Sequence, residues 1–157
     1  MKQSLICLAL AAAALAAQAA DTPGSNPNVP AVTAADRLAS ARKAIAAKDW
    51  NVALRELQTA ARDDPRNADV QNLLGYTYRK RPNPDVTKAF EHYYVALRLD
   101  PRHKGAHEYI GEAYLMQKRP AQAEEHLMEL EKICGNKTCE EYVDLAKSIA
   151  DYKAAAK

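Results

Sequence analysis

Apolar residues recur with helical spacing from residue 33 to the end of the chain, and polar or charged residues fill the positions between them. No stretch of that region alternates strictly between apolar and polar residues, as a half-buried strand does. The pattern therefore predicts an all-α protein. We expect helices at about 34–47, 50–63, 68–80, 85–99, 104–117 and 120–133, followed by an amphipathic helix within 138–155.

The predicted helices repeat at a nearly fixed interval, which indicates a repeat architecture. The positions of Ala53, Leu57, Ala60 and Pro65 recur 36 residues later and, in part, 34 residues after that. The most complete copy consists of Leu74, Gly75, Tyr78, Ala89, Tyr93, Ala96 and Pro101. The next copy has Leu130 in place of an alanine and lacks the final proline, but it keeps Ile110, Gly111, Tyr114, Ala123 and Leu127.

This pattern resembles the tetratricopeptide repeat, a helix–turn–helix unit of about 34 residues. The resemblance covers roughly residues 34 to 137 and is weakest in the first repeat, where Ser40, Ala41 and Ala44 stand at signature positions. It implies an α-solenoid of three helix–turn–helix repeats, at 34–67, 68–103 and 104–137, closed by a C-terminal capping helix at 138–155.

The signature residues also have a physical explanation of their own. Gly75 and Gly111, together with the alanines, allow two antiparallel helices to approach closely. Pro65 and Pro101 end the second helix of a repeat. Each helix pair buries only part of its apolar surface, so neighbouring repeats must stack. Larger residues are expected to fill the remaining space, namely Tyr78, Tyr93, Tyr114 and Leu127.

The last predicted helix has its own start signal and its own apolar stripe. Thr138 and Glu141 have the spacing of a capping box, in which each side chain satisfies the other residue's backbone amide. The simplest role of this helix is to cover the exposed apolar face of the last repeat, and a partner-binding helix is the alternative. The stripe consists of Tyr142, Leu145, Ala146, Ile149 and Ala150.

The first 19 residues have the features of a cleavable signal peptide. Lys2 precedes a short uncharged apolar stretch, and Ala17-Gln18-Ala19 resembles a signal peptidase site, with cleavage expected after Ala19. An uncleaved membrane anchor is the alternative. Residues 20–33 are rich in proline and small polar residues, so we expect a flexible linker. These features predict a periplasmic or secreted protein.

The net charge of +2, with basic and acidic residues interspersed, argues against a nucleic-acid-binding protein, which needs a concentrated basic face. No second apolar run approaches the length of a membrane span, so we expect none in the mature chain. The sequence has no glycine-rich phosphate loop, nucleophile elbow or metal-ligand cluster, and we predict neither catalysis nor a cofactor.

Cys134 and Cys139 are the two cysteines left after signal cleavage, and an oxidising compartment favours a disulfide between them. Gly135-Asn136 suits a helix end with positive φ, which would bring the sulfurs together. His103 and His107 are four residues apart and could present two imidazoles to a metal. A packing role for His107 is the preferred interpretation.

In tetratricopeptide proteins the first helices of the repeats line a groove for partner segments. The resemblance therefore implies a protein-binding groove lined by Asn72, Tyr76, Arg79, Lys80, Glu108, Tyr109, Glu112 and Met116, with Leu38, Arg42 and Ile45 from the first repeat. Family members that grip C-terminal carboxylates use Lys and Asn at defined places, which here hold Leu38, Arg42, Leu73, Gly105 and Tyr109. This departure argues against such a clamp.

The sequence thus predicts a non-catalytic periplasmic adaptor that binds a protein or peptide segment. Two alternatives stay open at this stage. One is a structural module that associates with further copies of itself, and the other is a metal-handling accessory protein that uses His103 and His107.

Overall fold

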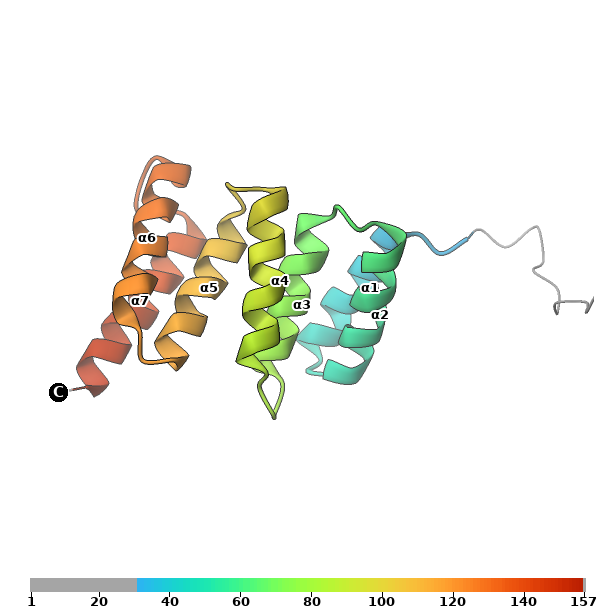
Figure 1. Cartoon of the computed structure of the whole chain (residues 1–157), viewed down its shortest axis with the longest axis horizontal. Helices are drawn as coiled ribbons and strands as arrows, with labels where there is room; N and C mark the ends of the chain where they lie inside the picture. Colours follow the sequence, from blue (N-terminus) through green and yellow to red (C-terminus); the bar gives the residue numbers. More distant parts are fainter. Residues whose placement is uncertain (1–30, 157) are drawn as a thin grey trace, which may run out of the picture. The chain divides into compact units, whose positions relative to one another are not determined.

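The computed structural model describes residues 31–156, which fold into seven helices (Figure 1). The predicted signal peptide at 1–19 and residues 20–30 of the predicted linker lie outside the described residues. The helices are α1 (Ala34–Ala46), α2 (Trp50–Asp63), α3 (Ala68–Lys80), α4 (Val86–Leu99), α5 (Lys104–Met116), α6 (Pro120–Cys134) and α7 (Glu140–Ala155).

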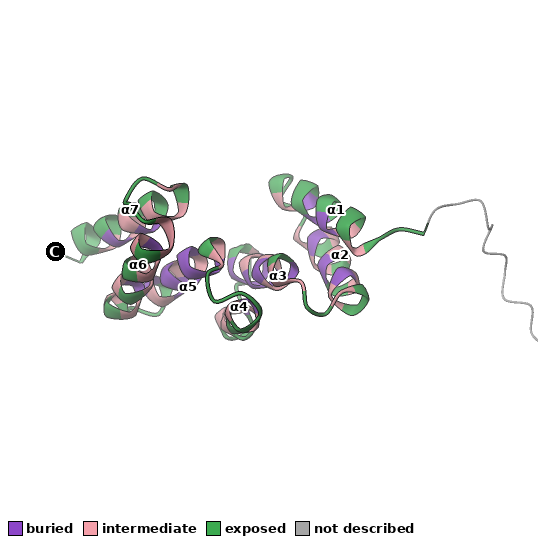
Figure 2. Cartoon of the chain, turned by 90° about the horizontal axis from the view of Figure 1, so that it is seen from above, coloured by how far each residue is buried: buried purple, intermediate pink, exposed green. Residues whose placement is uncertain are grey.

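Consecutive helices run in opposite directions and pack as pairs, α1 with α2, α3 with α4 and α5 with α6. Seen from above, α1, α3, α5 and α7 lie on one side and α2, α4 and α6 on the other (Figure 2). We call the first side the inner face and the second the outer face. The arrangement confirms the predicted all-α class, with helix–turn–helix repeats followed by a C-terminal helix.

The repeat signature lies in the core. Leu74, Ala89, Tyr93 and Ala96 are almost completely buried. A Cβ atom at Gly75 would lie 2.5 Å from Cε1 of Tyr93 and 2.9 Å from a backbone oxygen, so only glycine allows α3 to approach α4 this closely. Sequence periodicity therefore identified real packing positions.

Gly111 serves a different neighbour. A Cβ atom there would lie 2.6 Å from both methyl groups of Leu145, which belongs to α7. The expectation that this glycine admits the antiparallel partner within its own repeat is therefore incomplete, because its close contact is with the C-terminal helix. Leu145 and Ile149 are buried and α7 packs against α5 and α6, as expected of a helix that covers the last repeat. Ala150, assigned to the apolar stripe, is exposed.

Most helices begin at a side chain that accepts a backbone N–H three residues ahead, which satisfies a donor left free at the helix start. Asp49, Asn67 and Asp85 have this role, and Thr33 and Asp36 form a full capping box. The five-residue turn 81–85 is two residues longer than the turns 47–49 and 117–119, as predicted.

The predicted capping box at Thr138 is wrong. Helix α7 begins after Cys139, and no side chain caps it. The Thr138 hydroxyl instead donates to Oδ1 of Asn136 at 2.8 Å, and its backbone N–H donates to the same oxygen at 2.9 Å. The short loop between the cysteines uses the threonine for its own turn, so the hydroxyl does not reach the helix.

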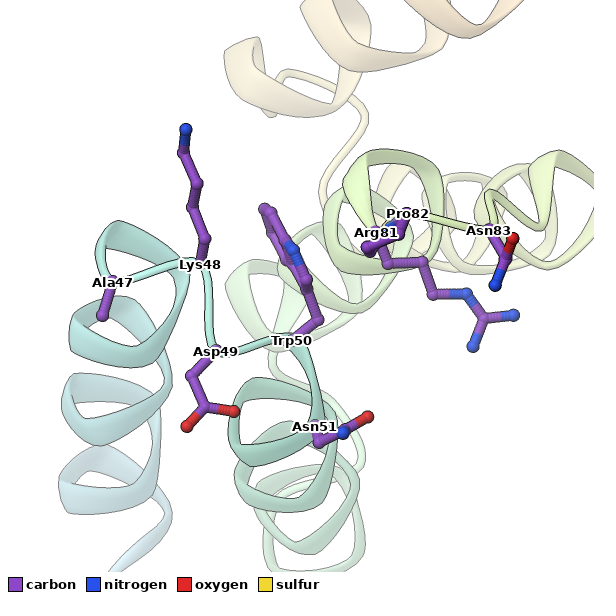
Figure 3. A pocket seen from close by; sticks show the side chains of 8 residues that line it. All are labelled: Ala47, Lys48, Asp49, Trp50, Asn51, Arg81, Pro82 and Asn83. Carbon is purple, nitrogen blue, oxygen red and sulfur yellow. The ribbon is translucent and has the colours of Figure 1, made fainter.

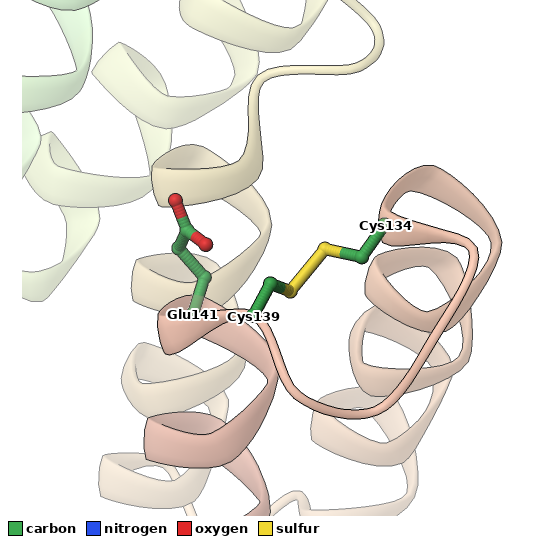
Figure 4. A group of neighbouring side chains, drawn as sticks. All are labelled: Cys134, Cys139 and Glu141. Atoms are coloured by element: carbon green, nitrogen blue, oxygen red, sulfur yellow. A yellow bond between two sulfur atoms is a disulfide. The ribbon is translucent and has the colours of Figure 1, made fainter.

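A disulfide joins Cys134 at the end of α6 to Cys139 before α7, with the sulfur atoms 2.14 Å apart and the Cα atoms 6.3 Å apart (Figure 4). Gly135 has φ +70°, the left-handed conformation predicted for it. Among residues 31–156, no helix has the length and apolar character needed to cross a membrane.

Candidate protein-binding face

The eight residues predicted to line the groove lie on α3 and α5, four on each helix. They differ in exposure. Lys80 and Met116 are exposed, and Tyr76, Tyr109 and Glu112 are half-buried. The side chains of Asn72, Arg79 and Glu108 are buried, with 5%, 5% and 9% of their surface exposed. The inner face is thus built from a buried polar layer beneath half-buried tyrosines.

Arg79 is the centre of that layer. Its Nε donates to the Tyr93 hydroxyl of α4 at 3.2 Å, and its guanidinium forms an ion pair with Glu112 of α5. Glu112 also accepts from the Ser148 hydroxyl of α7 at 3.2 Å. Each buried charge in this network has a partner, which offsets its cost of desolvation. The network therefore ties together α3, α4, α5 and α7.

Two tyrosines lie beside this network. The rings of Tyr76 and Tyr109 are 4.8 Å apart, and the Arg79 guanidinium carbon lies 5.6 Å and 5.5 Å from their centres. Such distances place a cation near the negative faces of the rings. Burial raises the pKa of both hydroxyls, so the rings stay neutral at physiological pH. The pair forms an uncharged aromatic surface between the second and third repeats.

A hollow of about 600 Å³ lies where the first repeat meets the second. Tyr76 and Lys80 line it, opposite the end of α1 and the indole of Trp50. A second hollow of about 690 Å³ adjoins it, and both share Lys48, Trp50 and Pro82 (Figure 3). The long turn after α3 supplies Pro82 and so forms one wall.

Sequence reasoning missed Trp50 as a candidate site residue. It is the one tryptophan of the chain and begins α2, which the register assigns to the outer layer of the first repeat. Its position beside a turn was the available signal, whereas its closeness to the longer turn of the second repeat is seen only in the structure. In Figure 3 the Trp50 ring and the Lys48 side chain extend in the same direction, between the end of α1 and the 81–83 turn.

Glu108 differs from the other buried charged side chains because it makes no hydrogen bond or ion pair with any described residue. Burial, followed by the neighbouring carboxylates of Glu112 and Asp144, raises the pKa of Glu108 to about 8. Desolvation and like charge both disfavour the ionised form. At neutral pH this side chain is therefore mostly protonated in the unliganded protein.

His103 and His107 do not converge on a common point. His103 Nε2 lies 3.0 Å from Asp69 Oδ1, and its Nδ1 accepts the Ala106 N–H as the cap of α5. His107 is buried, with Nδ1 2.9 Å from Nδ1 of His126 and Nε2 3.2 Å from the Pro101 carbonyl. The packing role predicted for His107 is confirmed.

Burial and the neighbouring His107 lower the pKa of His126 to about 4, so this second imidazole is neutral at physiological pH. Within residues 31–156, three potential metal ligands converge at Cys134, Cys139 and Glu141 alone (Figure 4). The two sulfurs there are bonded to each other, which removes the thiolates that a metal would need.

The fold and the inner face together define a helical-repeat protein. Residues 38–102 and 85–135 match the family described as the tetratricopeptide repeat. These matches span more than half of the chain, and the protein therefore belongs to the tetratricopeptide repeat family, which is non-catalytic. The predicted resemblance to this family is confirmed.

Three solved structures illustrate the likeness. One is the first tetratricopeptide domain of Spaghetti (RPAP3) bound to the HSP90 peptide SRMEEVD, with 15% identity and a TM-score of 0.67 over 82% of this chain and 100% of that one. The Sgt2 domain from Aspergillus fumigatus has 18% identity and a TM-score of 0.68 over 85% of both chains.

The third is the type III secretion translocator chaperone SycD of Yersinia enterocolitica, in an alternative dimer, with 15% identity and a TM-score of 0.70 over 83% of this chain and 98% of that one. At these identities the likeness concerns the fold alone. No curated protein matches the chain.

Proposed function

We propose that this chain is an exported, periplasmic adaptor whose inner face binds an extended or helical segment of another protein. The observation that carries the proposal is the hollow of about 600 Å³ between the first two repeats, bordered by Trp50, Tyr76 and Lys80. Aromatic residues of this kind dominate protein-recognition surfaces because they offer large contact areas at little conformational cost.

The family supports the same role. The similar domain of Spaghetti was solved with a peptide bound, and SycD is named a chaperone for secretion translocators. The periplasmic location rests on Lys2, the apolar stretch after it and Ala17-Gln18-Ala19. The disulfide between Cys134 and Cys139 is compatible with an oxidising compartment.

The test compares an inner-face variant with a matched outer-face variant. Tyr76→Ser/Met116→Ser removes a tyrosine and a methionine from the inner face, and Tyr94→Ser/Met128→Ser removes the same residue types from α4 and α6. Met116, Tyr94 and Met128 are exposed, at 48%, 41% and 55%. Neither pair changes the net charge.

The tagged proteins are crosslinked in the periplasm of the source cell and purified, after circular dichroism has shown that both variants fold. We expect a partner that the wild type and the outer-face variant capture and the inner-face variant loses. Partners captured equally by all three proteins would refute inner-face binding, and a protein found only in the cytoplasm would refute the periplasmic location.

Self-association is a second candidate function, favoured by the exposed apolar residues at the C-terminal end of the array. Met128 on α6 and Val143 on α7 are 55% and 47% exposed. A second copy could cover them. Light scattering over a range of concentrations decides this, since a strict monomer at all concentrations would eliminate the candidate.

A further inference from the structure

Two polar side chains on the inner face make no hydrogen bond within the described residues, and one of them has a buried oxygen. The Asn72 side-chain oxygen is buried without a hydrogen bond, although the residue is only 5% exposed. Glu108 is 9% exposed and forms neither a hydrogen bond nor an ion pair within the described part of the chain. Buried polar atoms are normally paired, so the unpaired Asn72 oxygen points to a missing donor. The Glu108 carboxyl, whose oxygens are not fully buried, lies on the same face and can share that donor once it is ionised.

The two acceptors belong to the same part of the inner face. Asn72 of α3 packs against Gly105 of α5, where a Cβ atom would lie 3.0 Å from the Asn72 amide nitrogen. Glu108 follows Gly105 by three residues and is therefore on the same side of α5, one turn further along. Gly105 leaves the space in which the Asn72 amide approaches α5.

The charges around Glu108 are predominantly negative. Those that act on it come from Arg79 of α3, Glu112 of α5, and Glu141 and Asp144 of α7. Arg79 and Glu112 neutralise each other in their ion pair, and Lys104 lies 3.4 Å from Glu141. Asp144, which is exposed, has no partner among the described residues.

We infer that the inner face binds a lysine or arginine side chain of the partner segment at Glu108, with Asp144 and the Asn72 amide oxygen as the neighbouring acceptors. The inference rests on the proposed function and names the chemistry of the segment. A primary ammonium offers three N–H donors and a guanidinium five, with no acceptor to clash with this surface. The aromatic pair Tyr76 and Tyr109 borders the same face and suits the apolar part of such a side chain.

A metal ion fits this place less well than an organic cation. Metal sites need several ligand atoms that converge on one point, and Glu108 and Asp144 are not part of such a group in the described residues. A flexible side chain with several donors can satisfy acceptors that are spread over three helices.

The binding step has a proton balance that can be measured. The unliganded Glu108 carboxyl has a pKa of about 8 and carries a proton at pH 7. A bound ammonium or guanidinium favours the carboxylate, so the proton leaves to solvent as the cation enters. Affinity should therefore rise with pH from 6.5 to 8.5, while the lysine side chain stays charged throughout.

The probes are 12-residue random peptides displayed on phage and selected on the purified chain at pH 8.5. The best peptide is then synthesised in its original form and with each lysine or arginine replaced by norleucine. Dissociation constants are measured for the wild type, for Glu108→Gln and for the control Glu125→Gln. Glu125 is exposed on α6 and receives the same substitution.

We expect the selected peptides to share a cationic residue whose replacement weakens binding about tenfold or more. Glu108→Gln should weaken the original peptide equally and leave the norleucine peptide unchanged. The wild type should bind about tenfold or more tightly at pH 8.5 than at pH 6.5, with release of about one proton at pH 7 in calorimetry. Glu108→Gln should lose both effects, and Glu125→Gln should retain them.

Gln has the shape of the protonated carboxyl, so Glu108→Gln is expected to fold. Peptides that lose binding to Tyr76→Ser/Met116→Ser but share no cationic residue would overturn this inference and leave the proposed function intact. Peptides that bind Tyr76→Ser/Met116→Ser as tightly as they bind the wild type would overturn the proposed function and the inference with it. A selection that yields no binding peptide would do the same.

Discussion

The two junctions between repeats solve the same problem in different ways. At both, an arginine of one inner helix pairs with a carboxylate of the next. Arg42 of α1 lies 2.9 Å from Asp69 of α3, and both side chains are more than half exposed. Arg79 of α3 pairs with Glu112 of α5, and the arginine side chain is only 4% exposed.

The surroundings follow from this difference. At the second junction α3 packs against α5, and the tilted rings of Tyr76 and Tyr109 fill the space between them. At the first junction the end of α1 and the turn that follows α3 do not pack tightly, and the two hollows beside Trp50 lie between them. The comparison teaches that a buried ion pair with packed tyrosines closes one junction, whereas an exposed ion pair leaves space at the other, where Trp50 remains available to a ligand.

The largest expected effect comes from breaking the buried pair. Arg79→Leu leaves Glu112 without its cation and the Tyr93 hydroxyl without its donor, and should lower the free energy of unfolding by about 3 kcal/mol. Arg42→Leu, at the exposed pair, should cost less than about 1 kcal/mol. Urea denaturation of both variants measures the two values. Equal losses would show that the junctions do not differ as described.

The disulfide tests whether the C-terminal helix depends on a covalent link. Cys134→Ser/Cys139→Ser should lower the free energy of unfolding by about 2 kcal/mol, because the bond closes a short loop. Removal of the bond should accelerate hydrogen exchange more in α7 than in α1. The reason is that α7, whose Leu145 fills the space at Gly111, is the helix that the disulfide holds in place. Uniform acceleration across all helices would contradict a local role for the bond.

The smallest effect concerns two lysines in equivalent turns. Lys48 and Lys118 both have φ +58°, a left-handed conformation that is unfavourable for a residue with a side chain. Lys48→Gly and Lys118→Gly should each stabilise the fold by about 0.5–1 kcal/mol. Only Lys48 borders both hollows at the first junction, so only its replacement should also change peptide binding. A matching change in binding by Lys118→Gly would remove that distinction.

Much of the fold could be predicted because repeat packing places strict demands on single positions. The positions of Gly75 and Tyr93 recur at fixed spacing for a steric reason. No residue larger than glycine fits at position 75, because the buried Tyr93 ring fills the space beside it. The helix boundaries agree to within one residue for α1 to α6, because Asp49, Asn67 and Asp85 mark helix starts by local hydrogen bonds.

The candidate site was less predictable. The register placed Tyr76, Arg79 and Glu108 on the inner face, but could not show that Arg79 is consumed by a structural ion pair while Glu108 has no partner. Thr138 failed as a cap for a local reason, because Asn136, two residues earlier, accepts both its N–H and its hydroxyl and so competes with the helix start.

The sequence by itself determined the helices, their pairing into repeats and the glycines that allow close packing, because these depend on neighbours at short and regular separations. The tertiary structure alone decided which polar groups on the inner face are satisfied. Residues from α3, α5 and α7 meet on the inner face across more than 70 positions of the chain, from Asn72 to Ser148. The contacts between these helices decide whether a buried charge has a partner. Arg79 has one and stabilises the array, whereas Glu108 has none among the described residues and is available to a ligand.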